Sequence, residues 1–125
     1  MSIGKQSTAT TIVNNQNTAK AVKSGSIDVF ATPMMIALME QAASDCLTDI
    51  LQSGQTSVGT QINVTHKAAS PLGAKISATA TITHIDGRKV LFQVTAHDNV
   101  TEIGNGTHER FIIDQEKFLK KLEQR

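Results

Sequence analysis

The stretch TPMMIALMEQAASDCLTDIL, residues 32–51, decides the fold, because its apolar residues recur at the spacing of an α-helix. Thr32 followed by Pro33 is a typical helix start, since Thr caps backbone N–H groups and Pro suits the first helical position. Gly54 fits the left-handed conformation that ends many helices. We therefore predict a helix from Pro33 to about Gln52, with Thr32 as its N-cap and its end at Gly54.

One carboxylate, Glu40, lies within the apolar stripe of this predicted helix. At about 100° per residue, the stripe contains Ile36, Met39, Ala43, Cys46, Leu47 and Ile50. Asp45 and Asp49 fall on the opposite, polar face. Burying an unpaired carboxylate costs free energy, so a chain that keeps one there usually has a use for it. Glu40 is then either a general base or nucleophile, or a structural carboxylate paired with a backbone donor or a lysine.

After Gly54 the period of the apolar residues changes from helical spacing to strict alternation, which predicts β-strands. Residues 57–66 form the first, and one face of it carries Val58, Thr60, Ile62, Val64 and His66. Alternating segments follow around residues 75–83, 90–97 and 107–113, and Asp86-Gly87 marks a hairpin turn. A short helix is expected at residues 115–122.

The N-terminal part gives weaker signals. Residues 1–10 are polar and rich in Ser and Thr, so we expect them to be loose or to form a short strand. Residues 19–22 are expected to form an edge strand. One helix this apolar must be covered on nearly all sides, and a curved antiparallel sheet wrapped around it does so. The prediction is a single α+β domain over residues 1–125, which forms a homodimer to protect its sheet edges.

Composition excludes several classes of protein. The chain has 12 Lys+Arg against 11 Asp+Glu and no Trp or Tyr, which argues against nucleic-acid binding. The lone Cys46 excludes an internal disulfide. Charges interrupt the apolar helix well short of the ~20 residues that a membrane span needs, and no signal peptide is visible. These three features lead us to expect a cytoplasmic protein. No metal-ligand spacing occurs, so we expect neither a metal nor a cofactor.

Four segments carry a resemblance to a known family. They are VFATPMM at residues 29–35, LMEQAA at 38–43, SVGTQINVTH at 57–66 and GNGTHERF at 104–111. Together they resemble the hotdog-fold thioesterases, in particular the fluoroacetyl-CoA thioesterase-like group of small acyl-CoA hydrolases. The resemblance covers roughly residues 20–120. It implies a hotdog fold, a dimer with active sites at the interface, and acyl-CoA bound along a groove between subunits.

The resemblance also implies roles for individual residues. Thr32, Glu40 and His66 match the family's active site, and Gly59 matches a glycine beside the acyl group. In this family the segment before the helix borders the acyl group. Phe30 is the only aromatic residue in that segment of this chain.

His108 and Arg110 also match the family motif, which implies substrate binding through the CoA phosphates. The residues themselves leave alternatives open. Thr32 could serve only as the helix N-cap, and His66 could be an ordinary core or loop histidine. Gly59 could mark a simple β-bulge, and His108 and Arg110 could decorate an exposed sheet face.

These expectations lead to an acyl-CoA thioesterase that cleaves a small or medium acyl-CoA into the free acid and CoA. In this function Glu40, helped by Thr32, activates water or attacks the thioester. His66 and the Gly59 amide stabilise the carbonyl oxygen. The alternative is a non-catalytic module of the same fold that binds acyl-CoA or another small ligand. A hydratase is a weaker option, because the predicted helix contains no histidine.

Overall fold

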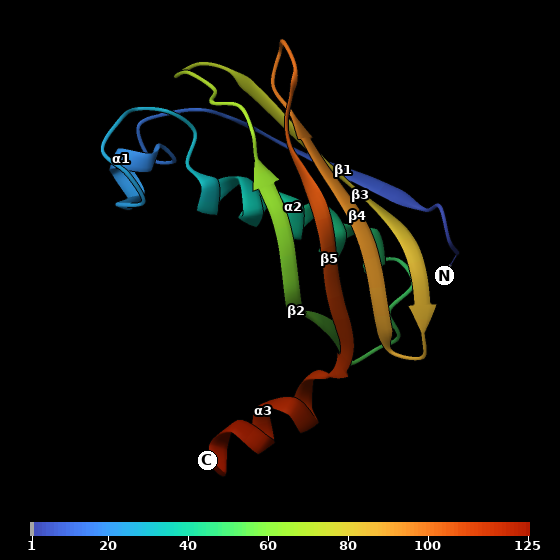
Figure 1. Ribbon diagram of the computed structural model, residues 1–125. Helices are drawn as coiled ribbons and strands as arrows, with labels where there is room; N and C mark the ends of the chain where they lie inside the picture. The colour runs from blue at the N-terminus through green and yellow to red at the C-terminus, as the bar shows by residue number, and fades with distance from the viewer. Residues whose placement is uncertain (1) are drawn as a thin grey trace.

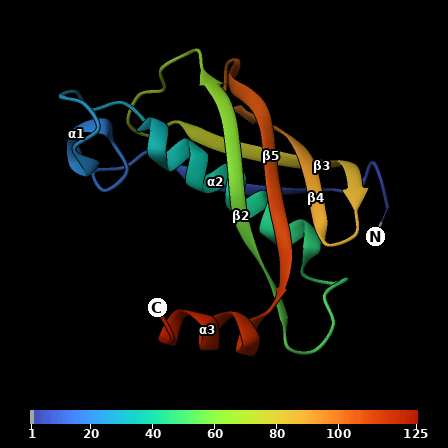
Figure 2. The same ribbon diagram turned by 60° about the horizontal axis from the view of Figure 1, so that its bottom comes forward.

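The computed structural model describes residues 2–125 and consists of one curved sheet around a central helix (Figure 1). Its elements in chain order are β1 (Gln6–Ile12), α1 (Ala19–Val22), α2 (Thr32–Leu47), β2 (Gln55–His66), β3 (Lys75–Asp86), β4 (Lys89–His97), β5 (Glu102–Asp114) and α3 (Gln115–Glu123). The strands pair antiparallel in the order β1-β3-β4-β5-β2. Two views show the sheet curling around α2 and α3 projecting past β2 (Figures 1 and 2). The predicted α+β architecture is confirmed.

The core lies between α2 and the concave face of the sheet. The buried residues of α2 are Met35, Leu38, Met39, Ala42, Ala43, Cys46 and Leu47. The sheet contributes alternate residues of its central strands, such as Ile76, Ala78, Ala80 and Ile82 of β3 and Val90, Phe92, Val94 and Ala96 of β4. Ile36 and Ile50, predicted to lie inside the apolar stripe, are only half-buried at its margin. The buried face of α2 is therefore rotated slightly from the predicted one.

Both predicted ends of the long helix are wrong. Ala31 is the N-cap, with extended backbone angles, and Thr32 is already the first helical residue. The hydroxyl of Thr32 is consequently available for a tertiary contact. The helix ends at Leu47, and Lys5, the residue before β1, donates a 2.7 Å hydrogen bond from its Nζ to the carbonyl of Cys46 in the last turn. Gly54 has φ +83°, but it lies in the turn before β2 instead of ending the helix.

The predicted edge strand at residues 19–22 is also wrong, because this segment is the short helix α1. The Thr18 hydroxyl accepts a hydrogen bond from the N–H of Ala21, which starts the turn, and Lys23 with φ 63° ends it. The edge strand lies earlier, at β1, where it pairs with β3. Of the two possibilities for residues 1–10, the short strand holds from Gln6 onward.

A β-bulge in β2 decides which side chains face α2. The pairing of β2 with β5 shifts between Gly59 and Gln61, so Thr60 is an extra residue on β2. The prediction that Val58 and Thr60 share the face of Ile62 is wrong, because the one extra residue reverses the alternation. Before the bulge the helix-facing positions are those of Ser57 and Gly59, and after it those of Ile62, Val64 and His66.

Candidate active site

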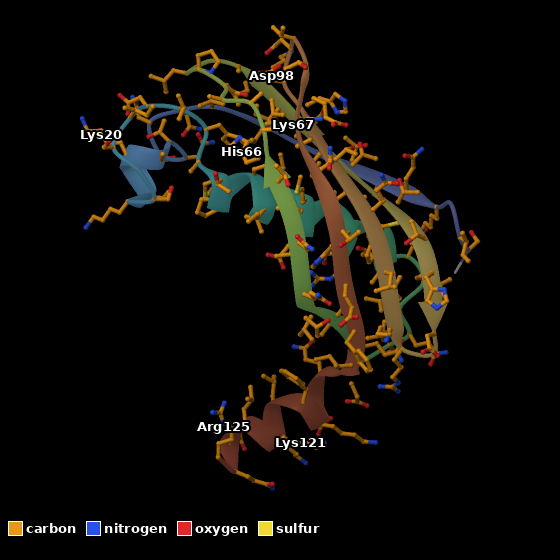
Figure 3. All side chains as sticks on the ribbon, in the orientation of Figure 1. Lys20, His66, Lys67, Asp98, Lys121 and Arg125 are labelled. Carbon is orange, nitrogen blue, oxygen red and sulfur yellow. The ribbon has the colours of Figure 1, made fainter. Side chains whose placement is uncertain are left out.

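The first part of the candidate site is a pair formed by Thr32 and His66, called here the Thr–His pair. Thr32 opens α2 and His66 closes β2, and Thr32 Oγ1 lies 2.7 Å from His66 Nδ1. Figure 3 shows His66 at the end of β2, beside the first turn of α2. The two ends meet because α2 and β2 run in opposite directions. This contact accounts for the Thr32 hydroxyl that does not cap the helix.

The other ring nitrogen of His66 lacks a partner. His66 Nε2 is buried, and nothing in residues 2–125 makes a hydrogen bond to it. Burial lowers the pKa of His66, and the neighbouring backbone of Ala68 opposes this shift. A lowered pKa favours the neutral ring at pH 7, which carries one N–H. When Thr32 donates its hydroxyl proton to Nδ1, that N–H lies on Nε2 and requires an acceptor.

The second part is a group around Glu40, called here the Glu40 cluster, which contains Glu40, Gly59 and Arg110. Glu40 Oε2 lies 3.7 Å from Arg110 Nη1, and the Glu40 side chain remains 41% exposed while that of Arg110 is 9% exposed. Glu40 is therefore at the margin of the buried face rather than inside it. A Cβ atom at position 59 would lie only 2.6 Å from Glu40 Oε2, so the carboxylate occupies space that only glycine leaves open.

Arg110 is held by three protein groups. Its Nε donates to Ser57 Oγ at 2.9 Å, and its Nη2 donates to the Ser57 carbonyl at 3.0 Å. Its Nη1 lies 3.3 Å from His108 Nε2. Burial lowers the pKa of Arg110, and the charge of Glu40 opposes this effect. A guanidinium buried to this degree needs a counter-charge, and Glu40 supplies it.

His108 completes the support of Arg110 as a neutral ring. Its Nδ1 lies 2.8 Å from the carbonyl of Gln61, and because a carbonyl only accepts, Nδ1 carries the proton. Nε2 then has a lone pair that accepts from Arg110. Burial is the main reason why the pKa of His108 is lowered, which is consistent with a neutral ring. His108 also stacks on Phe92 in the core, with ring centroids 6.1 Å apart.

Burial decides one open alternative for these two residues. His108 and Arg110 are 2% and 7% exposed, so the possibility that they decorate an exposed sheet face is wrong. Both face α2. Gly59 borders the bulge, as one of its two alternatives requires, and its missing side chain also leaves space for Glu40.

Within one chain the Thr–His pair and the Glu40 cluster are separate. Thr32 and Glu40 are eight residues apart on α2, which corresponds to about 12 Å along the helix axis at ~1.5 Å per residue. No hydrogen bond among residues 2–125 joins Glu40 to Thr32 or His66. The three residues predicted as one active site therefore form two half-sites in the single chain.

Phe30 lies deeper than its predicted role suggests. It is 1% exposed and belongs to the hydrophobic core, and its N–H donates to the carbonyl of Ser70. A cavity of about 170 Å³ between α2 and β1 has Phe30, Met34 and Leu38 in its wall. Sequence reasoning missed Ser57, because only the bulge at Thr60 reveals that its side chain faces Arg110.

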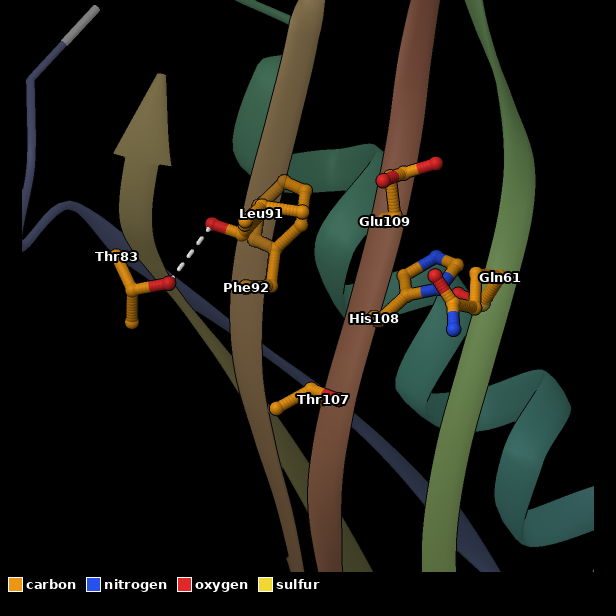
Figure 4. A pocket seen from close by; sticks show the side chains of 7 residues that line it. All are labelled: Gln61, Thr83, Leu91, Phe92, Thr107, His108 and Glu109. Atoms are coloured by element: carbon orange, nitrogen blue, oxygen red, sulfur yellow. Dashed lines mark hydrogen bonds between the residues drawn. The ribbon is translucent and has the colours of Figure 1, made fainter. Parts of the chain in front are cut away.

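A cavity of about 280 Å³ lies on the opposite face of the sheet (Figure 4). Its wall includes Gln61, Thr83, Thr107 and Glu109, and also His108, which contacts Arg110 on the other side. In the part of the chain that the structure describes, no group of three or more His, Cys, Asp or Glu is placed to hold a metal ion. None of the helices in that part is long and apolar enough to cross a membrane.

Replacing Gly59 by alanine is expected to lower turnover about a hundredfold, because the new Cβ would lie 2.6 Å from Glu40 Oε2 and push the carboxylate out of its position. The fold is expected to survive, since the displaced atom is the end of a half-exposed, flexible side chain. Thiol release and the melting temperature, measured together, test this. Thr60→Ala, on the outer face of the same strand, is the matched control. Equal turnover of Gly59→Ala and the control would contradict the role of the bare backbone.

Comparison with known proteins identifies the family. Residues 13–116 match the family model described as fluoroacetyl-CoA-specific thioesterase. The chain is 46% identical over 98 residues to the fluoroacetyl-CoA thioesterase of Streptantibioticus cattleyicolor. The matched region covers 78% of this chain and 70% of that protein.

Two solved structures extend this likeness. A structure of the fluoroacetyl-CoA thioesterase FlK superposes with a TM-score of 0.94 at 38% identity, over 100% of this chain and 97% of that one. A hot-dog-like protein from Thermanaerovibrio acidaminovorans has a TM-score of 0.90 at 23% identity, over 98% of this chain and 91% of that one, and shares the fold. The predicted hotdog fold is confirmed, and the chain belongs to the family of fluoroacetyl-CoA-specific thioesterases.

Proposed function

We propose that this chain hydrolyses the thioester bond of a small acyl-CoA, with Glu40 as the central catalytic residue. The observation that carries this proposal is a carboxylate held between a buried guanidinium and a strand backbone without a side chain. Such a carboxylate can approach a bound thioester from the side that Gly59 leaves open. Two of the relatives named above, the protein of Streptantibioticus cattleyicolor and FlK, are fluoroacetyl-CoA thioesterases, which supports the reaction class.

The proposed reaction uses water as its second substrate. Glu40 takes a proton from the water, whose oxygen attacks the carbonyl carbon of the thioester. The C–S bond then breaks, the acid is released, and the CoA sulfur receives a proton. In the alternative route Glu40 attacks the carbonyl carbon itself, the C–S bond breaks to release CoA as a thiolate that takes up a proton, and water hydrolyses the resulting anhydride to the free acid and Glu40. In both routes the Gly59 amide and His66 stabilise the developing negative charge on the carbonyl oxygen.

We further propose that the complete site forms in a homodimer, where the Thr–His pair of one subunit meets the Glu40 cluster of its partner. β2 lies at one edge of the sheet, so a second β2 can pair with it antiparallel. The Thr–His pair lies at the carboxyl end of β2, and Gly59 lies in its amino-terminal half. Antiparallel pairing of two such strands places one group opposite the other. The Thr–His pair of each subunit would then lie near the partner subunit's carboxylate.

This arrangement assigns a role to the remaining predicted residues. His108 and Arg110 support Glu40 from the sheet, because their polar groups are directed to Ser57, Gln61 and the Glu40 carboxylate. Phe30, two residues before Thr32, belongs to the hydrophobic core next to the start of α2. The CoA phosphates would bind elsewhere along the subunit groove. A cytoplasmic location stays a prediction.

Thiol release from a panel of acyl-CoAs tests the function. The panel contains acetyl-, fluoroacetyl-, medium-chain and aryl-CoA, with free CoA detected by a thiol reagent and the melting temperature followed in parallel. Turnover of at least one short acyl-CoA is the expected result. If no acyl-CoA were cleaved while several raised the melting temperature, the protein would be a binding module and the proposal would be wrong.

A further inference from the structure

Ser57 is the only residue in the described chain that holds the Arg110 guanidinium at two points. Its side-chain oxygen accepts from Nε at 2.9 Å, and its own carbonyl oxygen accepts from Nη2 at 3.0 Å. Two neighbouring nitrogens of one planar group are thus fixed by two oxygens of one residue. This fork restricts both the position and the rotation of the guanidinium plane.

The direction of the third nitrogen follows from this fork. With Nε and Nη2 bound to Ser57, Nη1 is turned away from β2 and lies 3.7 Å from Glu40 Oε2. His108 holds the same nitrogen from the side, at 3.3 Å. Glu40 itself makes no shorter polar contact in residues 2–125 and is 41% exposed, so the charge of Arg110 is its one fixed neighbour.

Ser57 also shares its strand with Gly59. The two residues lie on the same face of β2, immediately before the bulge, and Gly59 is opposite Arg110 in the pairing with β5. One short segment of β2 thus clears space for the carboxylate and sets the cation beside it. The sequence does not show this, because a regular strand through residues 57–66 would assign Ser57 to the face opposite His66.

We propose that Ser57 is a positioning residue that acts through Arg110 to hold the Glu40 carboxylate in its catalytic orientation. The kinetic part of this inference rests on the proposed thioesterase function. The Ser57 hydroxyl touches no substrate in this scheme. Its effect is on the orientation of the Arg110 guanidinium. When Arg110 loses the Nε contact, its side chain can rotate, and Glu40 then loses the cation that is fixed beside it.

A purely structural role is the competing explanation. In that case Ser57 only satisfies the hydrogen-bonding capacity of a buried guanidinium, and its loss lowers stability without a specific effect on turnover. Three variants separate the two. Ser57→Ala removes the hydroxyl and keeps the carbonyl contact, and Ser57→Thr keeps both. Thr60→Ala is the matched control, since the Thr60 hydroxyl bonds Glu109 Oε2 at 2.6 Å on the outer face of the same strand.

Three measurements are made on each full-length variant. Proton exchange at Arg110 Nε, followed by NMR, reports the hydrogen bond to Ser57. The ¹³C shift of the Glu40 carboxylate reports the direction of the neighbouring charge. Steady-state kinetics on the preferred acyl-CoA give kcat and KM separately, below the melting temperature of every variant.

We expect Ser57→Ala to speed exchange at Arg110 Nε, to move the Glu40 carboxylate shift and to lower kcat about tenfold with KM nearly unchanged. Ser57→Thr should restore all three values, and Thr60→Ala should alter none. Faster exchange with an unchanged carboxylate shift and unchanged kcat would overturn the inference in favour of a structural role. Unchanged exchange in Ser57→Ala would overturn it as well.

The NMR measurements keep this test separate from the test of the function. A wild-type protein that cleaves no acyl-CoA would refute the thioesterase proposal. The positioning of Glu40 by Ser57 would then be judged on the exchange rate and the carboxylate shift alone. A shift that moves in Ser57→Ala and returns in Ser57→Thr supports it, and one that stays constant overturns it.

Discussion

Glu40→Gln is expected to abolish detectable thiol release, with a loss in kcat of at least about a hundredfold. Glutamine keeps the size and shape of the side chain but can neither accept a proton from water nor form an anhydride with the acyl group. Both proposed routes therefore fail in this variant. The neighbouring Gly59 and Arg110 remain in place, because the three groups that hold Arg110 do not include Glu40.

The fold is expected to remain intact in Glu40→Gln. Glu40→Gln removes the counter-charge of the buried Arg110, but the guanidinium keeps its hydrogen bonds to Ser57 and His108 and the lost carboxylate was already 41% exposed. The melting temperature should stay within a few degrees of the wild-type value. Asp45→Asn is a suitable control, because Asp45 is an exposed carboxylate on the same helix and should tolerate neutralisation without loss of turnover. Turnover that persists in Glu40→Gln would exclude Glu40 as base and nucleophile.

The spacing of apolar residues in the sequence predicts the main features of the fold. The apolar residues of 32–51 repeat at helical spacing, and those of the later segments alternate, so the order of helix and strands is readable without a structure. Glu40 stands out in the same way, because a carboxylate interrupts an otherwise apolar stripe. Its partner is not readable, since Arg110 is 70 positions away in the chain and reaches Glu40 only through the pairing of β5 with β2.

The wrong predictions of the strand face and the helix ends have local causes that the spacing of apolar residues does not reveal. The bulge at Thr60 needs no special residue type, yet it reverses the face of every position before it. Thr32 has the composition of an N-cap, but Ala31 takes that place, and the Thr32 hydroxyl bonds His66 instead. In the last turn of α2 the carbonyl of Cys46 accepts from Lys5, which comes from a segment that sequence patterns leave ambiguous. In each case a tertiary contact overrides a local preference.

The division of the site into two halves leads to the most discriminating prediction. The Thr–His pair and the Glu40 cluster are about 12 Å apart along α2, so either substrate bridges them within one chain or a partner subunit completes each half. A dimer that combines two defective chains distinguishes these possibilities. One chain carries Glu40→Gln and the other His66→Gln, each with its own affinity tag. The mixed dimer is purified through both tags in sequence.

We expect this mixed dimer to regain about half of the wild-type turnover, although each parent dimer is inactive. In the trans arrangement, one site combines the intact Thr–His pair of the Glu40→Gln chain with the intact Glu40 of the His66→Gln chain. The other site carries both defects. In the cis arrangement each site carries one defect, and the mixed dimer stays inactive.

A reciprocal dimer makes the test independent of how well the chains assemble. A wild-type chain is paired with a chain that carries both Glu40→Gln and His66→Gln. In the trans arrangement each site then contains one defect, so turnover should be lost. In the cis arrangement one site is intact, so about half of the activity should remain. Because the two mixed dimers contain the same four side chains in different distribution, opposite outcomes can arise only from the subunit that supplies Glu40. Activity confined to the reciprocal dimer would refute the shared site, and a monomeric protein in sedimentation analysis would refute the dimer itself.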